Sequence, residues 1–213
     1  MSRVPPTTKL QSRLRDGYAL DELWGETMGL PAGDTKEKPL RLVAELLERE
    51  GVAYALIGGV AVQLHTEEPR TTRDIDLAVR VYSDVPRDAL LQAGFQHTGR
   101  HDHSDNWLAP ATSEHPQRTV VQFSAEEPAF VGAVDRASLV DLGGLRLRLV
   151  TAADLILLKL AAAEAPRRRA SKREHDIGDI LALIEEQPQL VPAIPGLAER
   201  LQRIRALKLD FEK

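Results

Sequence analysis

The hydrophobic residues that follow Pro39 recur at the spacing of one helix face and stop at Gly51. Because residues three and four positions apart share a face of an α-helix, this pattern predicts an amphipathic helix. Glycine after the last apolar position is a common helix end. The apolar positions are Leu40, Val43, Leu46 and Leu47.

A second helical region lies in the C-terminal part of the chain. Thr151 with Asp154 forms an N-cap pair, and Ser171 with Glu174 matches a capping box, so each pair predicts the start of a helix. Pro195 precedes one more helical stretch. The predicted helices span residues 152–165, 171 to about 186, and the part of 190–213 that follows the proline.

Short apolar runs between these regions predict β-strands. In residues 145–149 leucine alternates with arginine, and this period of two is typical of a half-exposed strand. Gly143-Gly144, just before it, favours a hairpin turn. The predicted strands span residues 52–57, 75–79, 119–124 and 145–149, with a hairpin partner at 139–142. Two short helices are predicted at residues 60–65 and 84–93.

Two stretches lack a clear period. Residues 1–35 carry Gly29, Pro31 and Gly33, which predicts an N-terminal arm or a loosely packed lead-in outside the core. Residues 95–117 are polar and rich in histidine, which predicts mobile connections with one strand near Trp107.

Composition narrows the class of protein. The 213 residues are 43% hydrophobic and 28% charged, as expected for one globular domain. The absence of cysteine excludes disulfide scaffolds, iron–sulfur clusters, thiolate zinc sites and cysteine nucleophiles. The formal net charge of -4 means that a polyanion would need a local basic patch. With neither a signal-like start nor an apolar run of roughly 20 residues, we expect a soluble, cytoplasmic protein without membrane contact.

The acidic pair Asp74 and Asp76 is the first candidate for chemistry. Two positions apart in a predicted strand, both carboxylates project from one face while Ile75 and Leu77 project from the other. Two adjacent like charges are costly unless a cation lies between them, and Mg²⁺ prefers such oxygen ligands. The pattern favours a divalent metal site; two solvated acids on an edge strand are the alternative.

Gly58 and Gly59 follow a predicted strand and open a short helix. The free backbone N–H groups and the positive end of a helix favour an anion there, such as a triphosphate. The next strand carries Asp74 and Asp76, so a phosphate cradle and a metal site would lie on neighbouring strands, as phosphoryl chemistry requires. A simple tight turn is the alternative.

Four motifs carry a family resemblance. Residues 57–61 (Ile-Gly-Gly-Val-Ala) and 69–77 (Pro-Arg-Thr-Thr-Arg-Asp-Ile-Asp-Leu) resemble the signature of the nucleotidyltransferase fold, and more narrowly of AbiEii-like nucleotidyltransferases, many of them toxins of toxin–antitoxin pairs. Lys159 in Leu-Lys-Leu-Ala, and Asp176 with Asp179 after His175, resemble that family's downstream lysine and its Asp-x-x-Asp helix.

The resemblance implies a fold and a domain organisation. The fold would be α/β (α+β), with a nucleotidyltransferase-like small mixed β-sheet flanked by helices. We expect an N-terminal arm of unknown role at residues 1–35, an α/β core at 36–150 and a helical part packing on the core at 151–213.

The resemblance also implies an activity, the metal-dependent transfer of NMP from an NTP to a hydroxyl. Asp74 and Asp76 would hold Mg²⁺ or Mn²⁺, Gly58 and Gly59 would accommodate the phosphates, and Lys159 would contribute to catalysis and nucleotide binding.

This sequence departs from the family at the third carboxylate, which such enzymes carry on a later strand. Gln122 occupies that place, and an amide has no negative charge and takes no proton near neutral pH. Loss of a positioned base costs about 10²- to 10⁴-fold in rate. The replacement carboxylates to consider are Asp102, Asp105, Glu126 and Glu127.

Three cationic or polar candidates have two interpretations each. Arg70 and Thr72 either contact the phosphates or the metal shell, or they satisfy loop carbonyls and cap the strand. Lys159 either reaches the triphosphate or pairs with Asp176 or Asp179, which share one face of the next helix.

Two further clusters of charged and histidine residues are interpreted as polar surface loops. The basic run of Arg167, Arg168, Arg169, Lys172 and Arg173 is typical of a solvated loop, with RNA phosphates as the alternative ligand. The cluster of His97, His101, His103, Asp102 and Asp105 has loose metal-ligand spacing, and a flexible polar loop explains it better than zinc does.

Two functional hypotheses result. The first is a Mg²⁺-dependent nucleotidyltransferase with an NTP donor and an RNA, protein or small-molecule acceptor, which could be a toxin with an antitoxin partner. The second, motivated by Gln122, is a catalytically impaired protein that keeps the fold and binds a nucleotide, RNA or a partner.

Overall fold

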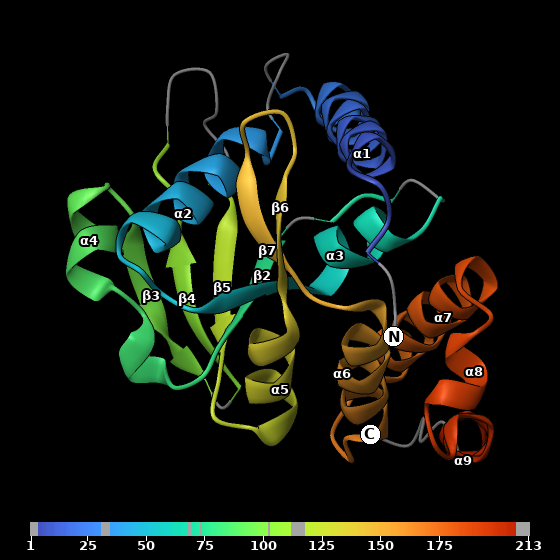
Figure 1. Ribbon diagram of the computed structural model, residues 1–213. Coiled ribbons are helices and arrows are strands. Elements are labelled where there is room, and N and C mark those ends of the chain that lie inside the picture. Colours follow the sequence, from blue (N-terminus) through green and yellow to red (C-terminus); the bar gives the residue numbers. More distant parts are fainter. Residues whose placement is uncertain are drawn as a thin grey trace.

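The computed structural model describes residues 4–30, 35–67, 70–72, 74–101, 103–111 and 118–207. Within these ranges the strands form one seven-stranded mixed sheet with helices packed against it (Figure 1). The expected α/β (α+β) fold with a helical C-terminal part is confirmed. None of the helices in these ranges is both long and apolar enough to cross a bilayer.

The strand order places the N-terminal strands in the centre of the sheet. The strands are β1 (Tyr54–Ile57), β2 (Asp74–Val79), β3 (Gln96–His101), β4 (Ser104–Leu108), β5 (Val120–Ser124), β6 (Ser138–Asp141) and β7 (Arg146–Leu149). Their order is β3-β4-β5-β2-β1-β7-β6. The β2/β5 and β1/β7 pairs are parallel and the others antiparallel.

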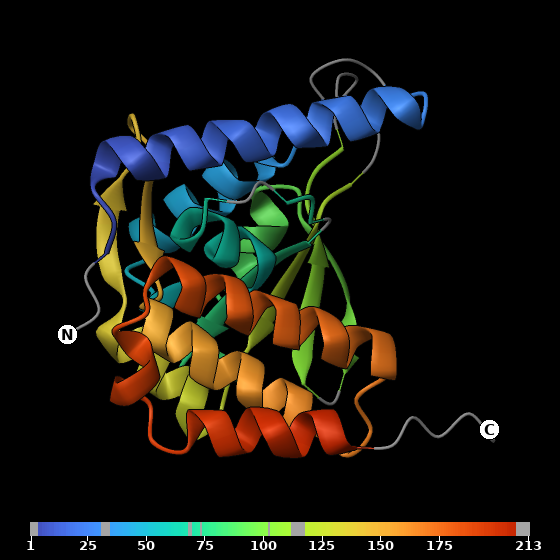
Figure 2. The ribbon, with the colours of Figure 1, turned by 90° about the vertical axis from the view of Figure 1, so that its right-hand side faces the viewer.

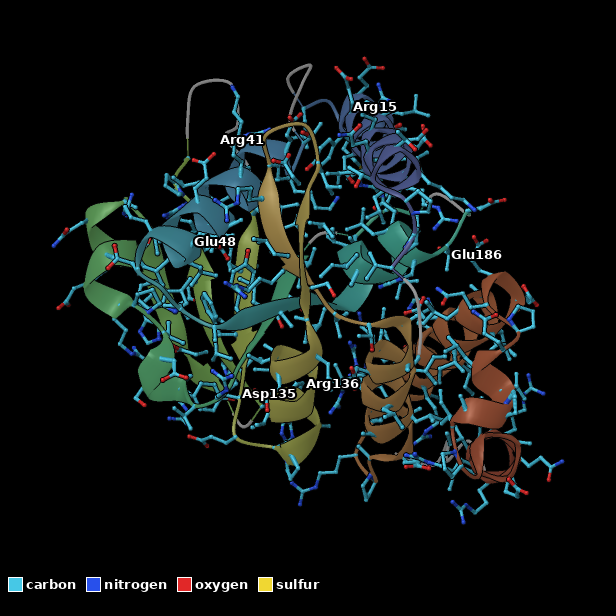
Figure 3. The ribbon with its side chains drawn as sticks, viewed as in Figure 1. Arg15, Arg41, Glu48, Asp135, Arg136 and Glu186 are labelled. Carbon is cyan, nitrogen blue, oxygen red and sulfur yellow. The ribbon has the colours of Figure 1, made fainter. Side chains whose placement is uncertain are left out.

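The helices gather on two sides of the molecule. They are α1 (Thr7–Thr27), α2 (Glu37–Arg49), α3 (Gly58–His65), the 3₁₀ helix η1 (Tyr82–Asp84), α4 (Arg87–Gln92), α5 (Pro128–Arg136), α6 (Ala152–Glu164), α7 (Ala170–Glu186), α8 (Leu190–Ala193) and α9 (Leu197–Ala206). Figure 2 shows α1 across the top of the molecule and α6, α7 and α9 stacked below. Arg136 of α5 pairs with Asp154 of α6 at 2.5 Å, which ties this stack to the sheet (Figure 3).

The helix starts and ends predicted from the sequence can be compared with the structure. The Thr151 hydroxyl accepts a hydrogen bond from the Asp154 N–H at 3.1 Å, so the predicted N-cap of α6 is confirmed. The capping box at Ser171 is wrong, because α7 begins at Ala170 after Arg169 and has no side-chain cap. The helix expected at residues 84–93 is divided into η1 and α4, because Pro86 lacks the N–H that would continue it.

The interpretation of the N-terminal segment as a loosely packed arm is wrong. Residues 7–27 form the 21-residue helix α1, and its Leu10 and Leu14 are 0% and 5% exposed. Gly17 lies so close to Gln63 of α3 that an added Cβ would be 1.5 Å from Nε2. The helical period is hard to recognise in the sequence because the buried stripe contains Arg13 and a glycine. The division of the chain into three parts stays a prediction.

Arg13 connects α1 to two helices that are distant in sequence. Its Nη1 donates to the Leu64 carbonyl of α3 at 3.0 Å, and its Nη2 donates to Glu186 at the end of α7 at 2.5 Å. The Gln63 side chain donates in return to the Arg13 carbonyl at 2.7 Å. Figure 3 labels Glu186 at this end of α7, and Arg15 on α1. α1 therefore braces α3 against α7.

Replacing Arg13 with methionine is expected to lower the free energy of unfolding by about 2 kcal/mol, because the Leu64 carbonyl loses its buried donor. The melting temperature should fall by about 4–8 °C, measured by circular dichroism. Arg15→Met is the control, because Arg15 is exposed on the same helix. Equal melting temperatures for the two variants would contradict the bracing role.

The interpretation of residues 95–117 as mobile connections is wrong for the described part. Strands β3 and β4 form an edge hairpin, and Trp107 and Asp105 are 1% and 0% exposed. Asp105 accepts hydrogen bonds from Arg87 at 2.7 Å and His97 at 2.6 Å. Some of the polar residues that suggested a loop thus pair around the buried Asp105, while most of β3 is exposed. Residues 102 and 112–117 lie outside the described residues.

His65, the last residue of α3, gives the fold an acid-sensitive point. Its Nε2 lies 2.7 Å from the Val150 carbonyl, and burial lowers the pKa of the imidazole to about 4. An unfolded chain takes up this proton at a pH near 6.5, so stability is complete above that pH and is lost as the pH falls towards 4. From pH 7.5 to pH 5 the stability contributed by His65 should fall by about 2 kcal/mol.

His65→Gln should remove this part of the pH dependence, since glutamine can still donate to the Val150 carbonyl and does not titrate. Urea unfolding at pH 7.5 and pH 5 measures it. A variant that loses as much stability as the wild type on acidification would show that His65 is not the responsible group.

Candidate active site

The acidic pair lies on one face of the central strand β2. Ile75 and Leu77 are 0% and 1% exposed on the opposite face, whereas Asp74 and Asp76 keep some solvent contact. The expectation that both carboxylates share a face is therefore met. In register, Asp76 is opposite Ile57 of β1 and Gln122 of β5.

The glycine turn meets the acidic pair directly. Gly58 begins α3 with φ +65°, and a Cβ on it would lie 1.9 Å from Asp76 Oδ2. The backbone N–H of Gly59 donates to the Asp76 carboxylate. A Cβ on Gly59 would lie 2.7 Å from Thr72 Oγ1. Only residues without side chains allow these groups to approach so closely.

A cavity of about 330 Å³ opens at this point. The sheet and the turn contribute one wall, and the opposite wall comes from α6, α7 and the segment between them. The lining residues are Gly59, Arg70, Thr72, Asp74, Asp76, Gln122, Lys159, Arg168, Lys172, His175, Asp176 and Asp179. The cavity thus brings the acidic pair together with Gly59, Arg70, Thr72, Gln122, Lys159, Asp176 and Asp179, while Gly58 lies against Asp76 without lining the cavity.

The electrostatics of the pair favour a bound cation. Burial, followed by the neighbouring charge of Asp74, raises the pKa of Asp76 to about 6, against the opposing influence of Lys159, the Gly59 N–H and Lys172. A divalent cation between the carboxylates would relieve both causes, and its preferred ligands are oxygens. In the described ranges no three histidine, aspartate or glutamate side chains form a metal-holding group, so the two aspartates would leave most coordination positions open.

Gln122 stands at the third-carboxylate position and interacts with the pair. Its Nε2 donates to Asp74 Oδ2 at 3.2 Å. A glutamine can therefore neutralise part of the charge of Asp74, but it cannot take a proton.

The described carboxylates among the considered replacements do not line the cavity. Asp105 is in register with Phe123 and so projects from the opposite face of the sheet. Glu126 follows β5, where its N–H bonds to the Arg80 carbonyl and its side chain pairs with Arg100. Glu127 is exposed, 4.0 Å from His103. Asp102 lies outside the described residues.

Three basic side chains of the cavity are held by two aspartates of α7. Lys159 Nζ lies 3.1 Å from Asp176 and 2.7 Å from Asp179. Arg168 pairs with Asp176 at 2.6 Å, and Arg70 pairs with Asp179. Burial lowers the pKa of Lys159, and the charge of Asp176 opposes that shift. The pairing interpretation of Lys159 is thus correct, and its position in the cavity wall leaves nucleotide contact open.

Thr72 has the structural role that was considered for it, the satisfaction of a backbone carbonyl at the start of the strand. Its hydroxyl donates to the Asp74 carbonyl at 3.5 Å, beside Gly59. The loop before β2 is thereby fixed to the acidic strand, and both Thr72 and Arg70 still line the cavity.

The basic run is only partly a solvated loop. Arg168 is ion-paired, and Arg173 donates to the Ala163 carbonyl at 2.8 Å. Lys172 lines the cavity together with His175; the sequence suggested only RNA phosphates as an alternative ligand for Lys172 and gave His175 no role of its own. Lys172 lies four residues before Asp176, and His175 lies four residues before Asp179; this spacing is the signal that could have placed them on the same helix face.

The zinc interpretation of the histidine cluster stays unsupported in the described residues. His97 pairs with Asp105, and His103 is exposed in the hairpin turn. The pair Asp105–His97 fixes the edge of the sheet to α4 through Arg87.

Comparison with solved structures shows where this fold occurs. One similar structure is an antigenic nucleotidyltransferase-like protein from Paracoccidioides brasiliensis, with TM-score 0.50 and 18% identity, covering 81% of this chain and 94% of that one. Another is JHP933 from Helicobacter pylori, with TM-score 0.53 and 16% identity, covering 78% of this chain and 71% of that one. At these identities the likeness concerns the fold. Comparison with curated proteins finds no similar sequence.

The sequence profile of one family matches residues 41–209, and its description is nucleotidyl transferase AbiEii toxin, type IV TA system. The matched segment contains all the residues that line the cavity. Since it takes in most of the chain, the protein belongs to the AbiEii nucleotidyl transferase toxin family.

Proposed function

We propose that this protein transfers NMP from an NTP to a hydroxyl group of an acceptor in a reaction that depends on Mg²⁺ or Mn²⁺. The observation that carries the proposal is the meeting of three features in one cavity: an acidic pair, a glycine turn at a helix start, and a wall of basic side chains. Each feature suits one part of a metal-bound nucleotide.

The phosphates would bind where α3 begins. The positive end of a helix favours an anion. Lys159, Lys172 and Arg168 on the facing wall add positive charge, which would balance the pyrophosphate as it leaves.

Asp74 and Asp76 would hold the cation, and their pairing on one face suits that role. When bound, a divalent cation polarises phosphoryl oxygens and lowers the barrier to displacement. Gln122 would keep Asp74 oriented through the amide donor.

The acceptor and the partner follow from the family only by analogy. An RNA, a protein or a small molecule with a hydroxyl group would suit the reaction. The description of the family as a toxin supports an antitoxin as a binding partner.

The direct test uses the wild-type protein with each of the four NTPs labelled at the α-phosphate. Mixed transfer RNA, an aminoglycoside and the protein itself serve as acceptors, with Mg²⁺, Mn²⁺ or excess EDTA. We expect label transfer and pyrophosphate release with either metal and neither product with EDTA. Absence of both products with every nucleotide and acceptor would refute the proposal.

The second candidate function, a nucleotide-binding or partner-binding module, is favoured by one observation: an amide at the third carboxylate position. It predicts metal-dependent NTP binding without pyrophosphate release. Isothermal titration with a non-hydrolysable NTP analogue, next to the transfer assay, separates the two functions.

A further inference from the structure

Transfer to a hydroxyl requires a group that takes the hydroxyl proton, and among the described residues the sheet side of the cavity has no carboxylate beyond Asp74 and Asp76 to do so. Gln122 fills that position, and Asp105, Glu126 and Glu127 do not line the cavity. The proton acceptor must therefore come from another part of the wall.

The acidic groups of the wall are already engaged. Asp176 is paired with Lys159 and Arg168, and Asp179 with Lys159 and Arg70. These carboxylates hold the basic side chains in place, and protonating one would release its partners.

His175 is the remaining proton acceptor among the described residues that line the cavity. It is exposed, and no hydrogen bond or ion pair of the described residues occupies its ring. On α7 it lies three residues after Lys172 and four before Asp179, so it shares the helix face that forms this wall. Histidine changes charge near neutral pH and is the most common general base.

We infer that His175 is a catalytic residue that accepts the proton of the acceptor hydroxyl, an inference that rests on the proposed nucleotidyl transfer. The hydroxyl oxygen forms a bond to the α-phosphorus, and the bond from that phosphorus to the bridging oxygen of the β-phosphate breaks. Pyrophosphate leaves with the electron pair of that bond. The hydroxyl proton passes to the unprotonated nitrogen of the imidazole, which returns it to solvent.

The charges around His175 balance. The basic groups and the acidic groups that face it come from α7, from α6 and its following segment, from the loop before β2 and from β2 itself. They are Lys172, Lys159, Arg168 and Arg70 on one side and Asp176, Asp179, Asp74 and Asp76 on the other. Charges of both signs therefore border the ring.

The experiment compares His175→Gln and His175→Ala with the wild type, using the nucleotide and acceptor that the wild type labels and saturating metal. We expect kcat to fall by about 10²-fold in both variants, while the affinity for a non-hydrolysable NTP analogue stays within about twofold. Imidazole in the buffer should restore part of the rate of His175→Ala, because the site is open to solvent.

The pH profile separates proton transfer from a structural effect. Wild-type kcat should fall as the pH is lowered from about 8 to about 5, the range in which histidine takes up a proton, and His175→Gln should lose this limb. His103→Gln is the control, since His103 is exposed in the hairpin turn away from the cavity.

The outcomes are distinct. If His175→Gln has the same kcat as the wild type and the same fall of kcat at low pH, the role of His175 is overturned, and the proposed transfer reaction is unaffected. A reduced kcat without imidazole rescue and with the pH limb intact would also overturn it. Absence of transfer by the wild type would overturn the role together with the proposed function.

Discussion

Replacing Asp76 with asparagine is expected to lower the rate of nucleotidyl transfer by about 10³-fold, which corresponds to about 4 kcal/mol of transition-state stabilisation. The amide has nearly the same shape and can still accept the Gly59 N–H, but it removes the charge that would hold a cation. The metal concentration needed for half-maximal activity should rise sharply.

The same substitution should leave the fold intact or stabilise it. Burial and the charge of Asp74 disfavour the ionised form of Asp76, as its raised pKa shows, and a neutral amide avoids both penalties. We therefore expect an unchanged or higher melting temperature together with lost activity. Residues that serve catalysis at the expense of stability behave in this way.

Asp105→Asn is the matched control, because Asp105 is also a strand aspartate in the same sheet, on its opposite face. It loses charged hydrogen bonds to Arg87 and His97, so its melting temperature should fall while the rate per folded molecule is maintained. If Asp76→Asn transfers nucleotide at the wild-type rate and needs the same metal concentration for half-maximal activity, the assignment of Asp76 to the site is contradicted.

The centre of the site could be predicted because it depends on local geometry. Alternation along a strand placed Asp74 and Asp76 on one face, and the glycines between strand and helix marked the turn. Residues 54–79 contain both features, so a hairpin-like pairing of β1 with β2 was enough to bring them together.

The opposite wall could be predicted only in part, because it depends on tertiary packing. Arg70 and Asp179 are separated by 109 residues, and nothing in either segment indicates that they pair. Lys159 and Asp176 lie on consecutive helices, and the spacing on each helix was enough to suggest that contact. Lys172 and His175 were not predicted as cavity residues, because the sequence does not show which face of α7 packs towards the sheet.

The errors in the fold have one physical cause. In α1 and in the β3–β4 hairpin, charged side chains lie inside the protein: Arg13 is 5% exposed and Asp105 is 0% exposed. A pattern of hydrophobic and polar positions assumes that charges face solvent. Buried charges with dedicated partners break that assumption, and for Arg13 the partner Glu186 is 173 residues away.

Replacing Gly58 with alanine is expected to lower both cation affinity and the rate of transfer by about 10²-fold, the usual cost of displacing a reacting group by about 1 Å. The new Cβ would lie 1.9 Å from Asp76 Oδ2, far inside contact distance, so either the carboxylate or the turn has to move. Titration with Mn²⁺ and the transfer assay measure the two effects separately.

The chain offers a matched control in Gly51→Ala. Gly51 has φ +66° against +65° for Gly58, so alanine meets the same backbone strain of about 1–2 kcal/mol at both positions. An added Cβ at Gly51 meets no atom within 4 Å, however, and the residue lies at the end of α2, outside the cavity. Both variants should lose similar stability from the strain, and only Gly58→Ala should lose the cation. If the two variants bind Mn²⁺ equally well, the close approach of Gly58 to Asp76 has no part in forming the metal site, and the pairing of the glycine turn with the acidic strand serves the fold alone.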